Sequence, residues 1–296
     1  MACVLVTGAA GFLGSAVCRA GLAAGHSVVG LVRPGELTSS VEGVEYREFD
    51  WAHRDSIAEV LAEVAPGRIV HCAGATPRAR MNASDLYDAN GRLVWQLLDA
   101  VKAAAPQAGV VVPSTAAVYG PTALTPTAED EPLAPVSHYA WSKVLAEQIV
   151  SAFAQAEGVR ACVARPFNLL GEGEPAGSVV SDVVVQLRDD PALAVVRLRE
   201  TASVRDYTYV GDAAAALLML AERGVSGEAY NVCTGIGVSV AELVQAILDV
   251  WNSDAAIATT APDAAVTVSI GSADKLRGLG WEPRTSLREA LERLSG

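Results

Sequence analysis

The sequence predicts an α/β protein built on a doubly wound parallel sheet, with a smaller lobe toward its C-terminus. Up to Gly120, apolar strand-like runs alternate with helical patterns. The first run, Val4–Thr7, ends at glycines spaced three residues apart, Gly8, Gly11 and Gly14. Interior strands of a doubly wound sheet are apolar throughout, because helices cover both of its faces. A chain of 296 residues that is 51% hydrophobic and 19% charged can bury a core of that size.

The elements of the sheet follow in order along the chain. Each predicted strand is a short apolar run that ends at a turn, and the helices carry apolar residues at three- and four-residue spacing. The predicted strands are Val4–Thr7, Ser27–Arg33, Val44–Phe49, Arg68–Ala73, Gly109–Ser114 and Arg160–Arg165. The predicted helices are Phe12–Ala24, Asp55–Val64, Ser84–Ala105 and Ser137–Gln155. Residues 121–135 are rich in Pro, Thr, Glu and Asp, which predicts a surface loop.

The glycine turn after the first strand indicates a phosphate-binding loop. Gly8 allows the tight turn, Gly11 lets the backbone approach a pyrophosphate, and Gly14 lets the helix lie close to the strand. The phosphates would face the free N–H groups at the start of the helix. A glycine-rich turn between a core strand and a core helix is the alternative that this spacing leaves open. Ligands of doubly wound sheets bind at the carboxyl ends of the strands, so further site residues are expected in the loops there.

A change in composition after Pro166 indicates where the smaller lobe begins, because a cluster of Gly, Pro and Glu residues ends the regular alternation. We expect residues 1–166 to form a dinucleotide-binding domain, to which the chain returns around 203–235. Residues 167–202 and 236–296 are expected to form a substrate-binding lobe. The elements predicted after the change are Asp206–Val210, Asp212–Glu222, Glu228–Val232, Val240–Trp251 and Ser286–Leu294.

Tyr139 and Lys143 stand four residues apart in a predicted helix and therefore on one face of it. Only three of the 22 Lys and Arg residues are lysines, so a lysine at this position is unusual for this chain. A nearby ammonium and an oxidised nicotinamide both stabilise a phenolate, which lowers a tyrosine pKa from about 10. Tyr139 would then exchange a proton with a substrate oxygen while hydride moves to or from the adjacent carbon. An ordinary surface pair on the helix is the alternative.

Together, Thr7-Gly8-x-x-Gly11-x-x-Gly14 and Tyr139-x-x-x-Lys143 resemble the extended short-chain dehydrogenase/reductase family, the NAD(P)-dependent nucleotide-sugar epimerases, dehydratases and reductases. The resemblance covers nearly the whole chain and implies a Rossmann-type sheet. Pro113-Ser-Thr-Ala-Ala-Val-Tyr-Gly120 resembles the segment that carries the family's third catalytic hydroxyl, which falls on Thr115, with Ser114 as the competitor. This hydroxyl would hydrogen-bond the reacting oxygen. The catalytic residues implied are Thr115, Tyr139 and Lys143.

The resemblance also implies a cofactor site. Asp50 corresponds to the family's adenine contact, and Cys72-Ala73-Gly74 resembles the loop that walls the cofactor. Asn90 resembles the asparagine that braces the active-site strands, although a polar helix residue is the alternative. The residues expected to bind the cofactor are Gly8, Gly11, Phe12, Leu13, Arg33, Asp50, Trp51, Cys72, Ala73, Gly74, Asn90, Tyr139, Lys143 and Pro166.

Substrate contacts are implied by two segments of the second half. Asn168 in Arg165-Pro-Phe-Asn168 resembles the asparagine that contacts the sugar nucleotide. Arg205 opens a run that resembles the one whose arginine approaches the ligand's diphosphate, and arginine suits a bidentate grip on phosphate. An ordinary surface ion pair is the alternative for Arg205. The residues expected to bind substrate are Thr76, Thr115, Asn168 and Arg205.

Arg33 at the end of the second predicted strand favours NADP(H) as the cofactor. NAD-selective relatives usually end this strand with an acidic residue that accepts hydrogen bonds from the ribose, whereas a guanidinium pairs with a 2′-phosphate. A guanidinium that stacks on the adenine of NAD(H) is the alternative.

Ala116 and Ala117 narrow the reaction, because the family's 4,6-dehydratases carry an Asp-Glu pair there. Neither alanine transfers protons, which argues against dehydration. The expected activity is NADPH-dependent reduction of a nucleoside-diphosphate 4-keto-6-deoxyhexose, as in deoxysugar biosynthesis. A nucleotide-sugar 4-epimerase with tightly bound NAD and a reductase of another small carbonyl compound are the alternatives. The Tyr139–Lys143 pair disfavours a cofactor-sensing regulator without chemistry.

The remaining features concern partners and location. A formal charge of −12 argues against nucleic acid or an anionic membrane as partner. No basic leader precedes the first strand and no apolar run reaches the ~20 residues of a membrane span, so we expect a cytoplasmic protein. The five cysteines form no Cys-x-x-Cys pair, which indicates buried thiols rather than a metal site. The family's long helices pair in homodimers, and the resemblance implies a homodimer here.

Overall fold

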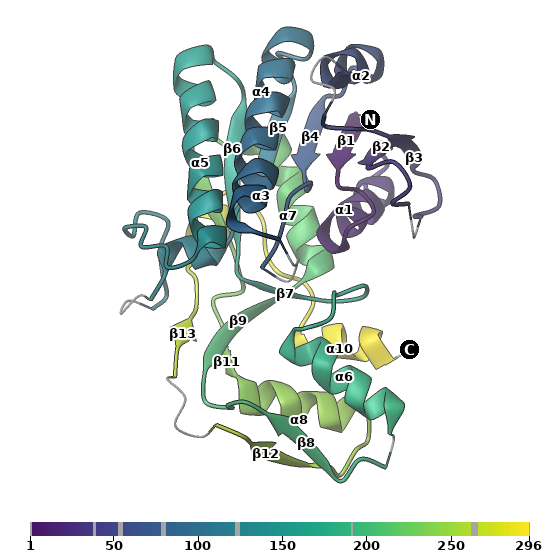
Figure 1. Ribbon diagram of the computed structural model, residues 1–296, viewed down its shortest axis with the longest axis vertical. Helices are drawn as coiled ribbons and strands as arrows, with labels where there is room; N and C mark the ends of the chain where they lie inside the picture. Colours follow the sequence, from purple (N-terminus) through teal and green to yellow (C-terminus); the bar gives the residue numbers. More distant parts are fainter. Residues whose placement is uncertain are drawn as a thin grey trace.

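The computed structural model describes residues 2–37, 40–52, 56–77, 81–121, 125–190, 192–261 and 266–295. A seven-stranded parallel sheet forms the upper part in Figure 1, and a lobe of short sheets and helices lies below it. The strands of the large sheet are β1 (Cys3–Thr7), β2 (Ser27–Val32), β3 (Glu45–Glu48), β4 (Arg68–His71), β5 (Gly109–Pro113), β6 (Ala161–Pro166) and β10 (Ala229–Val232). Their order in the sheet is β10-β6-β5-β4-β1-β2-β3. The doubly wound parallel sheet predicted from the sequence is therefore confirmed, and its order reverses between β1 and β4.

Helices cover both faces of this sheet. Helices α1 (Phe12–Ala23) and α7 (Val210–Arg223) pack together on one face, and α2 (Ser56–Val64), α4 (Leu93–Ala104) and α5 (His138–Glu157) pack on the other. Alternate side chains of β1 enter the two cores, Val4 and Val6 on the α1 side and Leu5 on the α4 side. This is why the strand is apolar throughout. Asp55, where one predicted helix starts, lies outside the described residues. Among the helices that the structure describes, none combines the length and apolar character needed to cross a membrane.

The single helix predicted for 84–105 is wrong in one respect, because it is divided into three parts. These are α3 (Ala83–Tyr87), a π-helical turn, η1 (Asp88–Arg92), and α4. A π turn adds a residue to the helical ladder, and such turns often occur at functional sites. Here the turn carries Asn90, a residue that is 1% exposed. Its side-chain amide hydrogen-bonds to segments distant in sequence. A regular apolar spacing on both sides of the turn concealed the interruption.

After β6 the chain leaves the large sheet and builds the lobe. Its elements are β7 (Asn168–Leu170), α6 (Val179–Asp189), β8 (Val195–Leu198), β9 (Val204–Tyr209), β11 (Gly237–Ser239), α8 (Val240–Val250), β12 (Ala256–Thr259), β13 (Val268–Ser269) and α10 (Leu287–Ser295). Helix α9 (Asp274–Arg277) instead packs against β10, with Leu276 in the core on the α1 side of the large sheet. Strand β9 pairs with β7, β11 and β13, and β8 pairs with β12. Helices α6, α8 and α10 enclose a third core that includes Val183, Leu243 and Leu291. Between β9 and β10 the chain returns to the large sheet as α7.

Candidate active site

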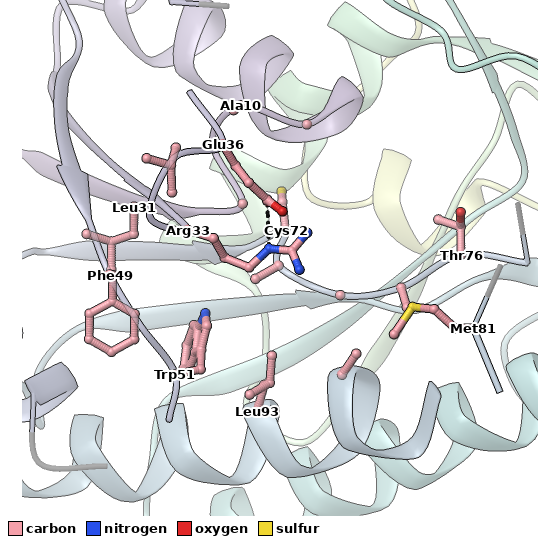
Figure 2. Close-up of a pocket in the computed structure, with 17 residues that line it drawn as sticks. Ala10, Leu31, Arg33, Glu36, Phe49, Trp51, Cys72, Thr76, Met81 and Leu93 are labelled. Carbon is pink, nitrogen blue, oxygen red and sulfur yellow. Dashed lines mark hydrogen bonds and ion pairs between the residues drawn. The ribbon is translucent and has the colours of Figure 1, made fainter. Parts of the chain in front are cut away.

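A pocket of about 310 Å³ lies at the carboxyl ends of β1, β2 and β4, where the strand order reverses. A crevice is expected at this position of an open α/β sheet, because the connections that follow the two neighbouring strands cross to opposite faces of the sheet. Of the predicted site residues, those that line the pocket are Gly8, Gly11, Arg33, Trp51, Cys72, Ala73, Gly74 and Thr76. Figure 2 shows Arg33, Trp51, Cys72 and Thr76 around this space.

The glycine turn forms one wall of the pocket. Gly8 has φ of +65°, and a Cβ there would lie 2.7 Å from the backbone nitrogen of Ala73. A Cβ at Gly14 would overlap the carbonyl oxygen of Gly8, so α1 packs too closely on the turn for any other residue. Gly11 is the N-cap of α1, and no side chain of the described residues caps this helix. The N–H groups of its first turn, which includes Phe12 and Leu13, are therefore available to bind an anion.

The other end of the pocket is apolar. The rings of Phe49 and Trp51 meet edge to face, with centroids 5.0 Å apart, and Leu31 lines the space with them. Asp50 lies between these two aromatics in sequence but is exposed and does not line the pocket. Its carboxylate accepts a hydrogen bond from the backbone nitrogen of Ala52 at 2.9 Å. The structure therefore assigns the flat apolar surface at this end to the aromatic neighbours of Asp50.

Lys143, on α5, lies next to Gly74 in the pocket wall but does not itself line the pocket. Its ammonium donates to the carbonyl oxygen of Pro113 at 3.0 Å, and a Cβ added at Gly74 would lie 3.6 Å from Nζ. Burial lowers the pKa of Lys143 to about 8. Tyr139 lies one turn earlier on the same helix face and is half-buried. Ser137 starts the helix two residues before Tyr139, because its side chain accepts a hydrogen bond from the backbone nitrogen of Ala140.

Thr115 lies on the neighbouring segment at the carboxyl end of β5. It is the N-cap of a 3₁₀ turn, η2 (Ala116–Tyr119), and its Oγ1 accepts from the backbone nitrogen of Ala117 at 3.2 Å. The turn packs against α5. Thr115, Tyr139 and Lys143 thus stand on two adjoining segments at the same edge of the sheet as the pocket. Ser114 is buried, and its Oγ has no hydrogen-bond partner among the described residues.

Asn90 joins the loop after β4 to α5. Its Oδ1 accepts from the backbone nitrogen of Ala75 at 2.9 Å, and its Nδ2 donates to the carbonyl oxygen of the same residue and to Oγ of Ser142, both at 3.0 Å. Ser142 in turn donates to the carbonyl oxygen of Tyr139 at 2.8 Å. Asn90 therefore braces the wall next to Gly74 without lining the pocket. Pro166, the last residue of β6, is buried and does not line it either.

His71 and Cys72 are two uncharged neighbours of Lys143, and Cys72 also lines the pocket. His71 is buried, with Nδ1 2.9 Å from Oγ1 of Thr7, which also accepts from the backbone nitrogen of Ala73. Burial, and then the positive charge of Lys143, lower the pKa of His71 to about 3. Burial raises the pKa of the Cys72 thiol. Both side chains are therefore neutral at neutral pH, and Thr7 fixes the loop that carries Cys72 and Ala73.

A buried ion pair anchors α5 below the candidate catalytic residues. Glu147, one turn after Lys143, receives hydrogen bonds from Nη2 of Arg165 at 2.7 Å and from its Nε at 3.1 Å. The two side chains are only 6% and 7% exposed. Arg165 also donates to the hydroxyl of Tyr119 at 2.9 Å. The pair thereby ties α5 to β6 and to η2.

Residues 4–233 match the NAD dependent epimerase/dehydratase family. The chain belongs to this family. It is 30% identical to GDP-6-deoxy-D-mannose reductase of Pseudomonas aeruginosa, over 97% of this chain and 94% of that protein. Its fold is similar to that of RMD from Pseudomonas aeruginosa complexed with NADPH, with a TM-score of 0.86, 27% identity and coverage of 99% and 97%. The Thermus thermophilus UDP-glucose 4-epimerase complex with NAD gives a TM-score of 0.85, 27% identity and 99% coverage of both chains.

Membership of this family makes the chain an NAD(P)-dependent enzyme of the nucleotide-sugar reductase and epimerase type. The resemblance drawn from the two sequence motifs is confirmed. Relatives with NADPH and with NAD bound are both similar to this chain, so the family fixes a nicotinamide cofactor without fixing which one.

The residues expected to bind substrate in this family member lie partly outside the pocket. Asn168 and Arg205 stand on the paired strands β7 and β9, and the Asn168 amide donates to the carbonyl oxygen of Asp206 at 3.4 Å. The Arg205 guanidinium donates to the carbonyl oxygen and hydroxyl of Thr267 at 2.7 and 2.6 Å. Asn168 and Arg205 stay predictions. Among the residues that the structure describes, Arg205 has these bonds rather than the surface ion pair considered as the alternative.

Sequence reasoning missed the other residues that line the pocket, which are Ala10, Leu31, Val32, Glu36, Phe49, Ala75, Met81, Ala89 and Leu93. It also missed Ser142, the partner of Asn90. Leu31 and Phe49 lie in predicted strands, and the position of Phe49 beside a predicted adenine contact is a signal that it faces the same site. Nothing in the sequence singles out Ser142, because a serine inside a helix has no motif.

Proposed function

We propose that this chain is an NADPH-dependent reductase that converts a nucleoside-diphosphate 4-keto-6-deoxyhexose to the 4-hydroxy sugar. The observation that carries the proposal is the Arg33 guanidinium, which lines the pocket directly after β2. A guanidinium at this position pairs with a 2′-phosphate, the group that distinguishes NADPH from NADH. The similarity to a GDP-6-deoxy-D-mannose reductase supports the same reaction class.

The lining of the pocket supports a dinucleotide as its ligand. The glycine turn with the uncapped start of α1 suits the pyrophosphate, and the apolar surface of Leu31, Phe49 and Trp51 suits an adenine ring. Gly74 lines the pocket next to the ammonium of Lys143, and we place the nicotinamide end there. When bound, the cofactor supplies the hydride that is added at carbon 4 of the sugar.

Tyr139 donates the accompanying proton from its hydroxyl to the oxygen at carbon 4. The Lys143 ammonium, on the same helix face, stabilises the phenolate that remains. The Thr115 hydroxyl donates a hydrogen bond to the same substrate oxygen and orients the carbonyl group. Ala116 and Ala117 hold no titratable group, so no residue there moves protons at the neighbouring carbons, and the reaction stops at reduction.

We expect the rate of reduction to fall as the pH rises above about 8. The folded pKa of Lys143 is about 8, so the ammonium is present below that value and is lost as the pH increases through it. Without the positive charge the phenolate of Tyr139 is less stable, and proton donation slows. The measurement is kcat between about pH 6 and 10 for wild type and for Lys143→Met. The kcat of Lys143→Met should be low at every pH and should show no decrease near pH 8. A wild-type kcat that stays constant to pH 10 contradicts the role of Lys143.

Replacing Arg205 by alanine should raise KM for the nucleotide sugar by about tenfold and change kcat by less than about threefold. In the proposal Arg205 exchanges its hydrogen bonds to Thr267 for the diphosphate of the substrate. Steady-state kinetics with the nucleotide sugar, and with a small ketone that has no diphosphate, give the comparison. Arg197→Ala, an exposed arginine of the same lobe, is the control and should leave both KM values unchanged. An unchanged KM for the nucleotide sugar in Arg205→Ala removes Arg205 from the substrate site.

The proposed function is tested by mixing the protein with NADPH and 4-keto-6-deoxyhexose nucleotides of several bases. Loss of the absorbance band of reduced nicotinamide, with formation of the 4-hydroxy sugar, is the expected result. No loss with any of these sugars removes the proposal.

A nucleotide-sugar 4-epimerase with tightly bound NAD is the second candidate. The observation that favours it is Glu36, whose carboxylate is paired with Arg33 in the pocket. The similarity to a UDP-glucose 4-epimerase complexed with NAD agrees with it. NAD that remains bound through purification, with interconversion of carbon-4 epimers and no net use of cofactor, distinguishes this activity from reduction.

We also propose that two copies of the chain associate through α4 and α5. These helices pack side by side, and both expose large apolar side chains: Trp95 is 37% exposed, Trp141 52% and Leu145 41%. Exposed apolar groups on adjoining helices mark interaction surfaces. Light scattering on the purified protein should give twice the chain mass of 30.6 kDa, and a monomer mass contradicts the dimer.

A further inference from the structure

Two charged side chains of opposite sign line the pocket after β2. Arg33 directly follows β2, and Glu36 comes three residues later. The Arg33 Nε donates to the Glu36 carboxylate at 2.6 Å, and the side chains remain 69% and 49% exposed. Figure 2 shows the pair joined across the pocket wall. The Glu36 carboxylate therefore binds the Arg33 guanidinium, which is the group that we expect to bind a 2′-phosphate.

The backbone holds Glu36 in this position. The chain turns after Arg33, and the backbone nitrogen of Glu36 donates to the carbonyl oxygen of Arg33 at 3.1 Å. Gly35 in the turn has φ of +72°, and its nitrogen donates to the carboxylate of Glu48 on β3 at 3.0 Å. The turn is thus anchored to β3 and keeps residues 33 and 36 on the same side. The ion pair follows from this turn rather than from a chance meeting of two long side chains.

We infer that Glu36 is a specificity-determining residue that weakens the binding of a 2′-phosphate and so lets the pocket accept NAD(H) as well as NADP(H). The inference rests on the proposed function, since it takes the pocket to hold a dinucleotide. A 2′-phosphate must displace Glu36 from the Arg33 guanidinium and must also bind next to a second negative charge. A 2′-hydroxyl meets neither obstacle, and it can donate a hydrogen bond to the carboxylate.

The test compares two ligands that differ only in the 2′-phosphate, adenosine 2′,5′-bisphosphate and adenosine 5′-monophosphate. Their Kd values are measured by calorimetry on the full-length wild type and on Glu36→Gln at low ionic strength. Glu36→Gln should tighten the bisphosphate by about tenfold and change the monophosphate by less than about threefold. The gain should shrink at high salt, because both charges are exposed.

Glu45→Gln is the matched control. Glu45 is also exposed and forms an ion pair with an arginine, Arg47, but it does not line the pocket. The same loss of one negative charge there should change either Kd by less than about twofold. Glu36→Gln in an Arg33→Ala background should tighten the bisphosphate by less than about threefold, because no guanidinium remains to be released.

The outcomes separate this inference from the proposed function. Suppose that both ligands bind the wild type. The inference is then overturned if Glu36→Gln leaves the ratio of the two Kd values unchanged, or changes it no more than Glu45→Gln does. In that case the dinucleotide site stands. Equal tightening in the Arg33 and Arg33→Ala backgrounds also overturns it. If neither ligand binds the wild type or any variant, the dinucleotide site itself is refuted, and the proposed function fails with it.

Discussion

Tyr139→Phe should lower kcat for the reduction by about 10³-fold and leave the Kd for NADPH within about twofold. The substitution removes only the hydroxyl that we assign as proton donor and keeps the half-buried ring on the first turn of α5. Lys143 remains bonded to Pro113, so the pocket wall beside Gly74 stays in place. Single-turnover reduction and a binding titration with NADPH separate the chemical step from cofactor binding.

Tyr87→Phe is the control for the lost hydroxyl. Tyr87 is also half-buried, lies on α3 next to α5, and its hydroxyl forms a 3.3 Å hydrogen bond with Nδ1 of His138, the residue before Tyr139. Its loss should change kcat by less than about threefold, since Tyr87 does not contact the proposed reacting atoms. A Tyr139→Phe variant that retains the activity of Tyr87→Phe contradicts the assignment of Tyr139 as the acid.

The second large effect is on stability. Glu147→Gln should lower the free energy of unfolding by about 3–5 kcal/mol, because it leaves the Arg165 guanidinium buried without its counter-charge. Arg165 is held by two of its nitrogens to the Glu147 carboxylate and by a third to the hydroxyl of Tyr119. Chemical denaturation followed by circular dichroism gives the change in midpoint.

Glu157→Gln gives the comparison on the same helix. Glu157 pairs with Lys102 on α4, but these side chains are exposed, so the loss should be less than about 1 kcal/mol. Similar shifts for the two variants contradict the view that the buried pair anchors α5. A large loss of unfolding free energy that is confined to Glu147→Gln agrees with this view. The kcat of the folded Glu147→Gln protein then shows how strongly the ion pair affects the positions of Tyr139 and Lys143.

The features that the sequence predicts well depend on short spacings. The glycine turn and the Tyr139–Lys143 pair are each contained in a few residues, and the alternation of apolar runs assigns them to the carboxyl ends of strands. Arg33 is predicted as a pocket residue for the same reason, because it directly follows β2. A local pattern is sufficient where one strand, one turn and one helix position the side chain.

The features that it predicts poorly depend on contacts between distant segments. Asn90 and Ser142 are 52 residues apart in sequence, and only the packing of η1 on α5 brings them together. Arg205 donates to Thr267, 62 residues away, which no motif indicates. The strands of the lobe, such as β7 with 3 residues and β13 with 2, are too short for an alternating pattern. These segments form strands because they pair with β9.

The central claim is that the cofactor pocket and the Tyr139–Lys143 pair form one active site for reduction at carbon 4. Deuterium transfer tests it most directly, with NADPH that carries deuterium at both C4 positions of its nicotinamide and a nucleoside-diphosphate 4-keto-6-deoxyhexose. Mass spectrometry of the product should find a single deuterium on carbon 4 of the sugar with wild type and almost no labelled product with Tyr139→Phe. A product without deuterium, or equal labelling by the two proteins, contradicts the account.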